Sequence, residues 1–134
     1  MLNQWLLKNE SKIVELRHWL HQHPEVGFDE LKTSAHLKKL LSSVGYVITQ
    51  TPEMKTGFTC EYTSGVKGPT LAIRCDMDAL LIQEQSKKEY KSINKGVMHA
   101  CGHDVHSSSL MGAALILNQL KEFFNGTIKL IFQP

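Results

Sequence analysis

The chain has 134 residues, of which 42% are hydrophobic and 21% are charged. This size suits one domain, and the composition is that of an ordinary globular protein, which excludes a disordered tail or a collagen-like fibre. Fifteen Lys and Arg residues against thirteen Asp and Glu leave a net charge of +2, too balanced for a dedicated binder of nucleic acid or of an anionic membrane surface. No apolar run approaches the roughly 18 residues that would span a bilayer.

The first ten residues and the cysteines both indicate a cytoplasmic protein. The segment 1–10 mixes polar with apolar residues and lacks a small-residue cleavage site, so we expect no signal peptide. The three cysteines, Cys60, Cys75 and Cys101, form an odd number, which argues against a disulfide framework and for a reducing cytosol. These totals leave one feature unexplained, which is that three of the seven histidines lie within residues 99–106.

Helical spacing of apolar residues predicts two helices in the first third of the chain. The first covers residues 3–22 as one or two helical pieces, and Pro24 closes it. The second covers residues 29–44, with Asp29 as its N-cap and Gly45 as its C-terminal stop.

Three strands are predicted next, at residues 46–49, 58–63 and 70–75. Ser64-Gly65 and Gly68-Pro69 bracket a turn between the second and the third of these strands. The sequence therefore predicts that these two strands form an antiparallel hairpin.

The rest of the chain predicts a loop, a helix and a strand. Residues 83–96 are polar and without periodicity, so we expect a surface loop. A helix is predicted over residues 104–124, ended by Asn125-Gly126, and a buried strand over residues 127–132. The whole order favours an α/β fold, a layered mixed β-sheet with flanking helices.

The strongest local signal for chemistry is the run Met98-His-Ala-Cys-Gly-His-Asp-Val-His106. Thiolate and imidazole are favoured ligands of zinc-like metals, and in a turn Cys101 and His103 can project to one side, with Gly102 supplying the required backbone torsions. Asp104 suits the N-cap of the following helix, whose dipole would favour the Cys101 thiolate. The plainer interpretation is a reduced core cysteine beside surface histidines.

Two further groups of polar residues could carry chemistry. Asp76 and Asp78 stand two apart at the end of a predicted strand, so both carboxylates project to one side, where they could bind a metal or orient an imidazole ligand. Taken alone, the two aspartates are better explained by a capped turn, but beside the cysteine–histidine run the site is the favoured interpretation. His18, His21 and His23 precede Pro24. His18 and His21, three residues apart, could share a helix face and a metal, but a solvated or packed helix end is the preferred interpretation.

Four motifs, in chain order, carry a resemblance to a known family. Residues 17–25 resemble R-x-x-L-H-x-x-P-E, residues 74–80 resemble R-x-D-x-D-A-L, residues 98–106 resemble M-H-A-C-G-H-D-x-H, and residues 126–134 resemble G-T-[IV]-x-L-[IL]-F-Q-P. These are the motifs of the metal-dependent N-acyl-amino-acid amidohydrolases, which include hippurate hydrolases and auxin-conjugate hydrolases and are related to aminoacylase and carboxypeptidase G. The resemblance spans nearly the whole chain.

The resemblance implies a hydrolase that cleaves the amide bond of N-acyl amino acids or amino-acid conjugates with two divalent metal ions, zinc or manganese. It implies that Cys101 bridges both ions, that His103 binds one of them, and that Asp78 orients a ligand. Asp76 falls where more distant relatives have a ligand histidine, and we do not expect it to be a ligand. In such a site the ions activate water and polarise the amide carbonyl, while a glutamate acts as the general base.

The sequence departs from the family pattern in two ways. The family's D-A-L-P-I is Asp78-Ala-Leu-Leu-Ile82 here, which loses a proline. In the family, F-Q-P is followed by alanine and two glutamates, further histidine ligands and an inserted dimerisation or lid domain. We therefore expect residues 1–134 to be the amino-terminal part of the catalytic domain, resembling the first half of a zinc-exopeptidase-like fold, and to be inactive alone.

Other functions remain open at this stage. A non-enzymatic thiol–imidazole module could bind one metal or sense oxidants through Cys101. A cysteine nucleophile paired with His103 or His106 is the weaker alternative, because residues two apart cannot readily form the nucleophile–base hydrogen bond. The expected partner is a small N-acyl amino acid, with neither nucleic acid nor membrane. Strands 70–75 and 127–132 would lack later neighbours, so we also expect self-association through a bare sheet edge.

Overall fold

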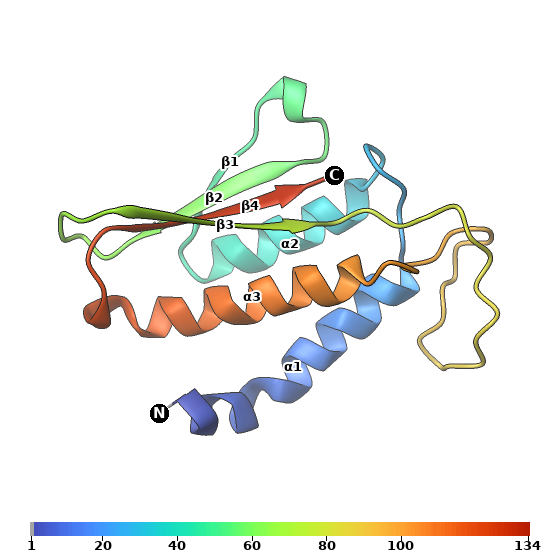
Figure 1. Ribbon diagram of the computed structural model, residues 1–134, viewed down its shortest axis with the longest axis horizontal. Helices are drawn as coiled ribbons and strands as arrows, with labels where there is room; N and C mark the ends of the chain where they lie inside the picture. The colour runs from blue at the N-terminus through green and yellow to red at the C-terminus, as the bar shows by residue number, and fades with distance from the viewer. Residues whose placement is uncertain (1) are drawn as a thin grey trace.

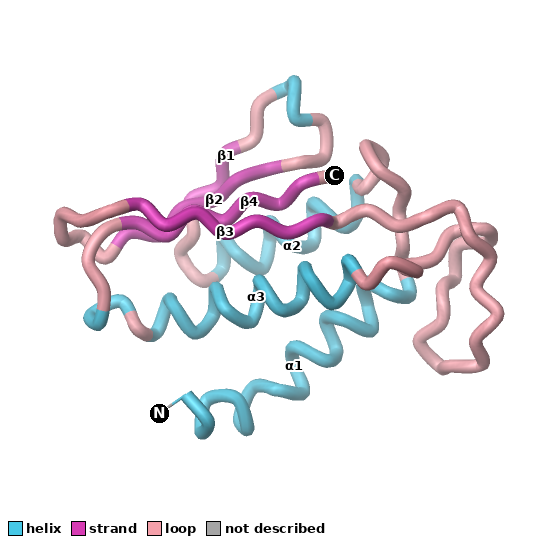
Figure 2. The backbone as a smooth tube through the Cα atoms, in the orientation of Figure 1, coloured by secondary structure: helices cyan, strands magenta, loops and turns pink. Residues whose placement is uncertain are grey.

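The computed structural model describes residues 2–134, in which one β-sheet packs on a layer of three helices (Figures 1 and 2). The predicted α/β class with a mixed sheet is confirmed. Two single turns of 3-10 helix, Pro52–Met54 and Lys121–Phe123, join the longer elements. These are, in chain order, α1 (Leu2–Gln22), α2 (Leu31–Ser43), β1 (Val47–Thr49), β2 (Phe58–Thr63), β3 (Thr70–Asp76), α3 (His103–Gln119) and β4 (Thr127–Gln133).

The strands pair in the order β1-β2-β4-β3, so the predicted β2–β3 hairpin is wrong. The last strand, β4, lies between them, antiparallel to β2 and parallel to β3. A parallel pair cannot be joined by a tight turn, and here α3 and its flanking loops make the long connection that such a pair needs. This arrangement brings the start of α3 close to the end of β3, where the candidate site lies.

The core lies between the inner face of the sheet and the helices. Ile128, Leu130 and Phe132 of β4 point inward and are buried, whereas the residues between them are partly exposed. The predicted strand over 127–132 therefore forms, but only one of its faces is buried because helices cover only that side (Figure 1). The ring of Phe132 stacks on that of Phe58 in β2, with 4.7 Å between ring centroids.

Helix α2 begins at Leu31, after the predicted N-cap Asp29. The residue in the N-cap position is Glu30, whose side chain does not cap the helix. Instead the Glu25 carboxylate accepts the backbone N–H groups of Lys32 and Thr33, at 3.1 and 2.8 Å. A carboxylate six residues upstream of the helix thus satisfies the free donors that an N-cap side chain would satisfy. The predicted stop at Gly45 is confirmed by its φ of +88°.

The start of β4 is fastened to the loop between β2 and β3. Gly126 donates its N–H to the carbonyl of Val66 (2.9 Å) and accepts the N–H of Ser64 (3.0 Å), while the N–H of Thr127 bonds to the carbonyl of Pro69 (3.0 Å). Gly126 has a φ of +103°, which glycine adopts without steric cost. This approach of two backbones sets where β4 enters the sheet.

The predicted surface loop at residues 83–96 contains neither helix nor strand, and its base is closed. Leu80 and Met98 exchange two backbone hydrogen bonds, each 3.0 Å long. We refer to residues 81–97 as the closed loop. Because its two ends are paired, residues 76–80 run beside residues 98–103, which places the aspartate and histidine motifs next to each other.

Strand β3 is an edge strand of the sheet, whereas β4 lies in its interior, so the bare edge that was expected from residues 70–75 and 127–132 is that of β3. Leu71 of β3 is 58% exposed. We expect a change of Leu71→Lys to reduce the concentration-dependent self-association of the chain, because a charge on an edge strand opposes strand-to-strand pairing. Size-exclusion chromatography with light scattering measures it. Val66→Lys, at an exposed loop position, is the control and should leave association unchanged.

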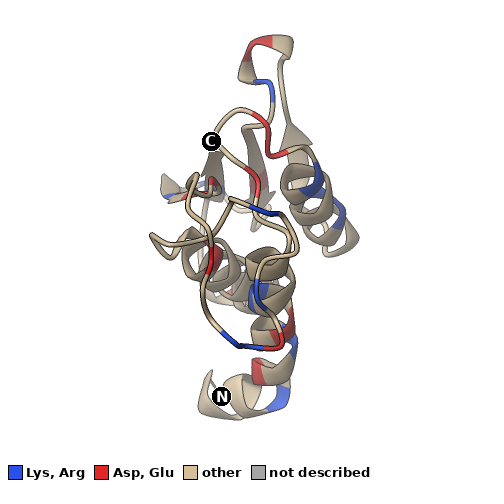
Figure 3. Ribbon diagram, turned by 90° about the vertical axis from the view of Figure 1, so that its right-hand side faces the viewer, with Lys and Arg blue, Asp and Glu red and all other residues tan. Residues whose placement is uncertain are grey.

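Within residues 2–134, no helix is both long enough and apolar enough to cross a membrane. Seen from the end that carries the closed loop, the ribbon holds positions of both acidic and basic residues (Figure 3). Charges of both signs therefore meet at this end.

Candidate metal centre

In the structure, His103 of the histidine motif is hydrogen-bonded to Asp78 of the aspartate motif. Nδ1 of His103, the first residue of α3, lies 2.7 Å from Oδ1 of Asp78 and 3.1 Å from the Asp78 carbonyl oxygen. Because both oxygens only accept, the Nδ1 atom carries a proton, and this arrangement leaves Nε2 as the nitrogen that can bind a metal. Imidazoles that bind metals are held in this way by a carboxylate on their other nitrogen.

Nε2 of His103 faces a second carboxylate. It lies 3.8 Å from Oδ2 of Asp76 at the end of β3. His106 lies one turn further along α3, with its ring 5.3 Å from that of His103. Within the described residues, Asp76, His103 and His106 form a group whose donor atoms all lie within 4.8 Å of one another, as a metal site requires. Sequence reasoning considered Asp76 and His106 but predicted neither as a ligand.

Arg74 competes with any cation for Asp76. Its guanidinium forms a close ion pair with Oδ1 of Asp76, and its Nε donates to Oε1 of Gln133 at 2.6 Å. Arg74 and Asp76 are neighbours on one face of β3, opposite Ile131 and Gln133 of β4. The Asp76 carboxylate is therefore partly neutralised by the protein itself, unlike that of Asp78, which faces His103.

Cys101 is the exposed thiol of the chain. Cys60 and Cys75 are buried, and burial is the leading cause that raises the pKa of each thiol to about 12, so both stay protonated near neutral pH. Cys101 lies two residues before α3, next to Gly102, which is the N-cap residue with a φ of +88°. Gly102 therefore supplies the turn's backbone torsion, as predicted. The Cys101 sulfur is not among the donors grouped around His103, and its predicted role as a ligand stays a prediction.

Asp104 is not the N-cap that the sequence predicts, since Gly102 takes that position. Its side chain is 1% exposed and points into the protein, where Oδ2 accepts the Nδ1–H of His21 at 2.7 Å and lies 3.0 Å from Nε of Arg17. The other ring nitrogen of His21, Nε2, lies 3.2 Å from Oε1 of Glu84 in the closed loop. Sequence reasoning missed Glu84, because a polar loop pattern gives no sign that one of its carboxylates is buried.

The histidines that precede Pro24 have packing roles. His18 stacks on Tyr90 of the closed loop, at 3.8 Å between centroids. His23 stacks on Trp19, whose carbonyl accepts a hydrogen bond from its ring at 2.7 Å. Together with the contacts of His21, this agrees with the prediction that the three form a packed helix end.

His99 is buried, with 4% exposure, and neither of its ring nitrogens has a hydrogen-bond partner within the described residues. Burial, the leading cause, lowers the pKa of His99 to about 4, although the nearby Asp104 opposes this shift. The ordinary value is about 6.5. Because the folded protein resists protonation that the unfolded chain accepts, stability is complete above about pH 6.5 and falls as the pH decreases towards 4.

A change of His99→Gln should remove this part of the pH dependence. The shift corresponds to on the order of 3 kcal/mol of unfolding free energy lost between pH 7 and pH 4 in the unmodified chain. Urea unfolding across that range measures the loss, and the variant should show a correspondingly shallower decline. His106→Gln, at an exposed histidine, should decline as steeply as the unmodified chain. Equal slopes for His99→Gln and the unmodified chain would contradict the assignment.

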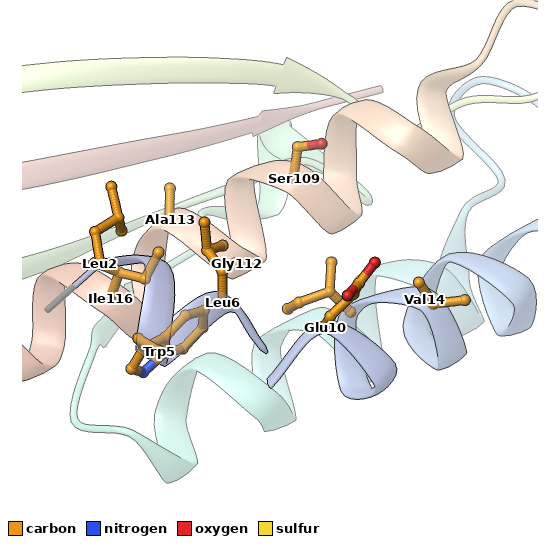
Figure 4. Close-up of a pocket in the computed structure, with 10 residues that line it drawn as sticks. Leu2, Trp5, Leu6, Glu10, Val14, Ser109, Gly112, Ala113 and Ile116 are labelled. Carbon is orange, nitrogen blue, oxygen red and sulfur yellow. The ribbon is translucent and has the colours of Figure 1, made fainter. Parts of the chain in front are cut away.

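A larger cavity lies away from these residues. It measures about 670 Å³ and opens between α1 and α3, where Leu2, Trp5 and Leu6 face Gly112 and Ile116 (Figure 4). Its lining is apolar, apart from Glu10 and Ser109. Among its lining residues only Glu10 has a side chain of the kind that binds metals, so the cluster around His103 remains the candidate metal centre.

Comparisons with known proteins show what this chain is similar to. Residues 72–134 match the sequence profile of peptidase family M20/M25/M40. An N-acetylcysteine deacetylase of Bacillus subtilis (strain 168) is 41% identical over 124 residues, which are 92% of this chain and 33% of that protein. IAA-amino acid hydrolase ILR1-like 5 of Arabidopsis thaliana is 43% identical over 122 residues, 91% of this chain and 28% of that protein.

A solved structure gives the same result in three dimensions. A dinuclear metal-binding peptidase of the M20 family from Bacillus subtilis matches with a TM-score of 0.89 and 41% identity, over 92% of this chain and 34% of that one. The chain spans about one third of the length of the curated relatives it matches.

Proposed function

We propose that this chain is part of a peptidase of family M20/M25/M40 and that it supplies metal-binding residues to a hydrolase of N-acyl amino acids or amino-acid conjugates. One observation carries the proposal. Asp78 holds the His103 ring so that its free nitrogen faces a polar cluster two residues from an exposed thiol. The names of the relatives supply the substrate class, since two of them are an N-acetylcysteine deacetylase and an IAA-amino acid hydrolase.

The donor set fits divalent metal ions. Zinc binds thiolate and imidazole, and manganese also accepts imidazole and carboxylate. We propose that Cys101 and His103 are ligands, with Cys101 shared between two ions, and that Asp76 and His106 lie close enough to join His103. When bound, the ions would supply Lewis-acid activation of the amide carbonyl and of water.

The chain's own residues hold the donors in place. Asp78 keeps the proton of His103 on Nδ1, so that Nε2 stays available as a donor. Cys101 lies two residues before α3, next to the N-cap Gly102, which places its thiol near His103 in the sequence. Arg74 binds Asp76 and thereby leaves Asp78 as the carboxylate that orients the ring.

A graft experiment tests the activity. The part of the B. subtilis N-acetylcysteine deacetylase that this chain matches is replaced by the chain, and cysteine release from N-acetyl-L-cysteine is measured with added Zn²⁺ or Mn²⁺. We expect turnover that a chelator abolishes and that Cys101→Ser or His103→Gln removes. His18→Gln, away from the cluster, should retain it. A folded chimera no more active than its Cys101→Ser version would overturn the proposal.

The 134-residue chain alone is expected to bind metal without turnover, because the base glutamate and the remaining ligands of the family pattern are not among its residues. A metal-binding or redox-sensing module without catalysis is the second candidate, and the exposed Cys101 thiol favours it. The chimera separates the two, since a module of that kind would bind metal without restoring hydrolysis.

A further inference from the structure

A group of four charged side chains lies beneath the candidate metal centre and touches none of its donors directly. We call Arg17, His21, Glu84 and Asp104 the buried ion cluster. Asp104, His21 and Glu84 are 1%, 5% and 8% exposed. His21 stands in the middle, with its two ring nitrogens 2.7 Å from Asp104 and 3.2 Å from Glu84, and Arg17 lies 3.0 Å from the same Asp104 oxygen.

Hydrogen bonds and ion pairs link all four side chains of the buried ion cluster. The ring nitrogens of His21 face the carboxylates of Asp104 and Glu84, and the Arg17 guanidinium lies 3.4 Å from Nδ1 of the same ring and 3.0 Å from the Asp104 carboxylate. A buried cluster of this kind contributes little net stability compared with an apolar core of the same shape, but it fixes the relative positions of the segments that carry it.

These four side chains come from three segments of the chain. Arg17 and His21 come from α1, Asp104 from the first turn of α3, and Glu84 from the closed loop. Glu84 is itself held, because its carboxylate accepts the Ser92 N–H at 2.6 Å and the Ser86 hydroxyl. The stretch 99–103 lies between two of these anchors in sequence.

Asp104 directly follows His103 on the helix. Successive residues of an α-helix project about 100° apart, so Asp104 points to the interior while His103 points to Asp78. A rotation or shift of the first turn of α3 would move both side chains together. Holding Asp104 therefore also holds His103, through the rigid backbone of one helical turn.

We propose that the buried ion cluster is the positioning element of the metal centre. Asp104, anchored by Arg17 and His21, fixes the first turn of α3 so that His103 keeps Nδ1 on Asp78 and Nε2 towards Asp76. That there is a metal centre to position rests on the proposed function, but the effect of the cluster on the orientation of His103 can be measured without metal. Asp104 and His21 are positioning residues in it, not ligands.

The test follows the tautomer of His103 in the 134-residue chain. Long-range ¹H–¹⁵N spectra at pH 8 report which ring nitrogen carries the proton, and His103→Gln identifies the signals. The unmodified chain should show one fixed form, protonated on Nδ1. Asp104→Asn should give signals averaged between the two tautomers and weaken Zn²⁺ binding about 10-fold, at the lower end of what loss of an orienting partner costs.

Tyr46→Phe is the matched control. It removes another buried hydrogen bond to α3, from the Tyr46 hydroxyl to the carbonyl of Ala114 at 3.0 Å, without touching the cluster. It should lower stability and leave the His103 signals and the Zn²⁺ affinity unchanged. A change of the His103 signals in Tyr46→Phe as large as that in Asp104→Asn would reduce the cluster to a general stabilising element and overturn the proposal.

Glu84→Gln provides a second variant if Asp104→Asn does not fold. Glu84 acts on Asp104 only through His21, so we expect the same change in the His103 signals at smaller amplitude. A folded Asp104→Asn or Glu84→Gln chain with an unchanged His103 tautomer overturns the positioning role. If the unmodified chain does not bind Zn²⁺ but the variants still change the tautomer, the positioning role stands and the proposed function fails.

Discussion

A change of Cys101→Ser is expected to weaken Zn²⁺ binding by this chain at least about 100-fold. Outer partners of metal ligands alone contribute 10- to 100-fold, so loss of a ligand should exceed that range. The thiolate is also the strongest donor at the site, since serine keeps its proton near neutral pH and is a much poorer ligand. Competition with a chromophoric chelator measures the affinity, and with Co²⁺ the sulfur-to-metal charge-transfer absorption should vanish.

Two further variants make this result decisive. Cys75→Ala removes a buried thiol whose sulfur contacts the Ser107 hydroxyl, and it should leave the Co²⁺ spectrum intact. His103→Gln should weaken binding as Cys101→Ser does. If His103→Gln and His106→Gln weaken binding and Cys101→Ser does not, the metal is held by Asp76, His103 and His106 without the thiolate, and the assignment of Cys101 is wrong.

A change of Gly126→Ala should destabilise the fold by about 3–5 kcal/mol, a large part of the stability of a small domain. Two effects add here. The φ of +103° is strained for any residue with a Cβ, and that Cβ would lie 2.0 Å from the Pro69 carbonyl oxygen, with the backbone of Gly68 2.8 Å away. Neither neighbour is a flexible side chain, so the start of β4 would have to move away from the loop before β3.

Gly65→Ala separates the two effects. Gly65 has a φ of +83° but nothing within 4 Å of its added Cβ, so this variant carries the backbone strain without the clash. We expect a loss of about 1–2 kcal/mol for it. Denaturant unfolding compares both variants with the unmodified chain. Similar losses in the two variants would show that the close approach at Gly126 relaxes at little cost.

The sequence predicts the elements of this fold well but not the order of its strands. Periodicity and turn residues depend on local chemistry, so α1, α2 and the strands lie where they are predicted, within a few residues. The helix predicted to reach residue 124 ends at Gln119 and continues as a 3-10 turn. The hairpin error has a different cause, because β4 enters between β2 and β3 through contacts that no local pattern encodes.

In the candidate site, too, the local motifs could be predicted from the sequence and the long-range contacts could not. The motifs at residues 74–80 and 98–106 are visible in the sequence. The structure brings Asp78 and His103 into hydrogen-bond contact, which is the contact expected of an aspartate that orients a ligand. The partner of Asp104 could not be predicted. His21 lies 83 residues away on another helix, and an aspartate at a helix start suits an N-cap as well as a buried ion pair.

The paired ends of the closed loop give this protein a place where its length can vary. Leu80 and Met98 are bonded to each other through their backbones, so residues 87–89, which lie between the contacts made by Ser86 and Tyr90, can follow a longer path without opening the base of the loop. Closing a longer path adds only a small entropy cost. A peptide tag inserted after Lys87, or a tryptic nick there, would leave both ends of the loop joined to the sheet and helix beneath, which makes this segment a natural attachment point for a label.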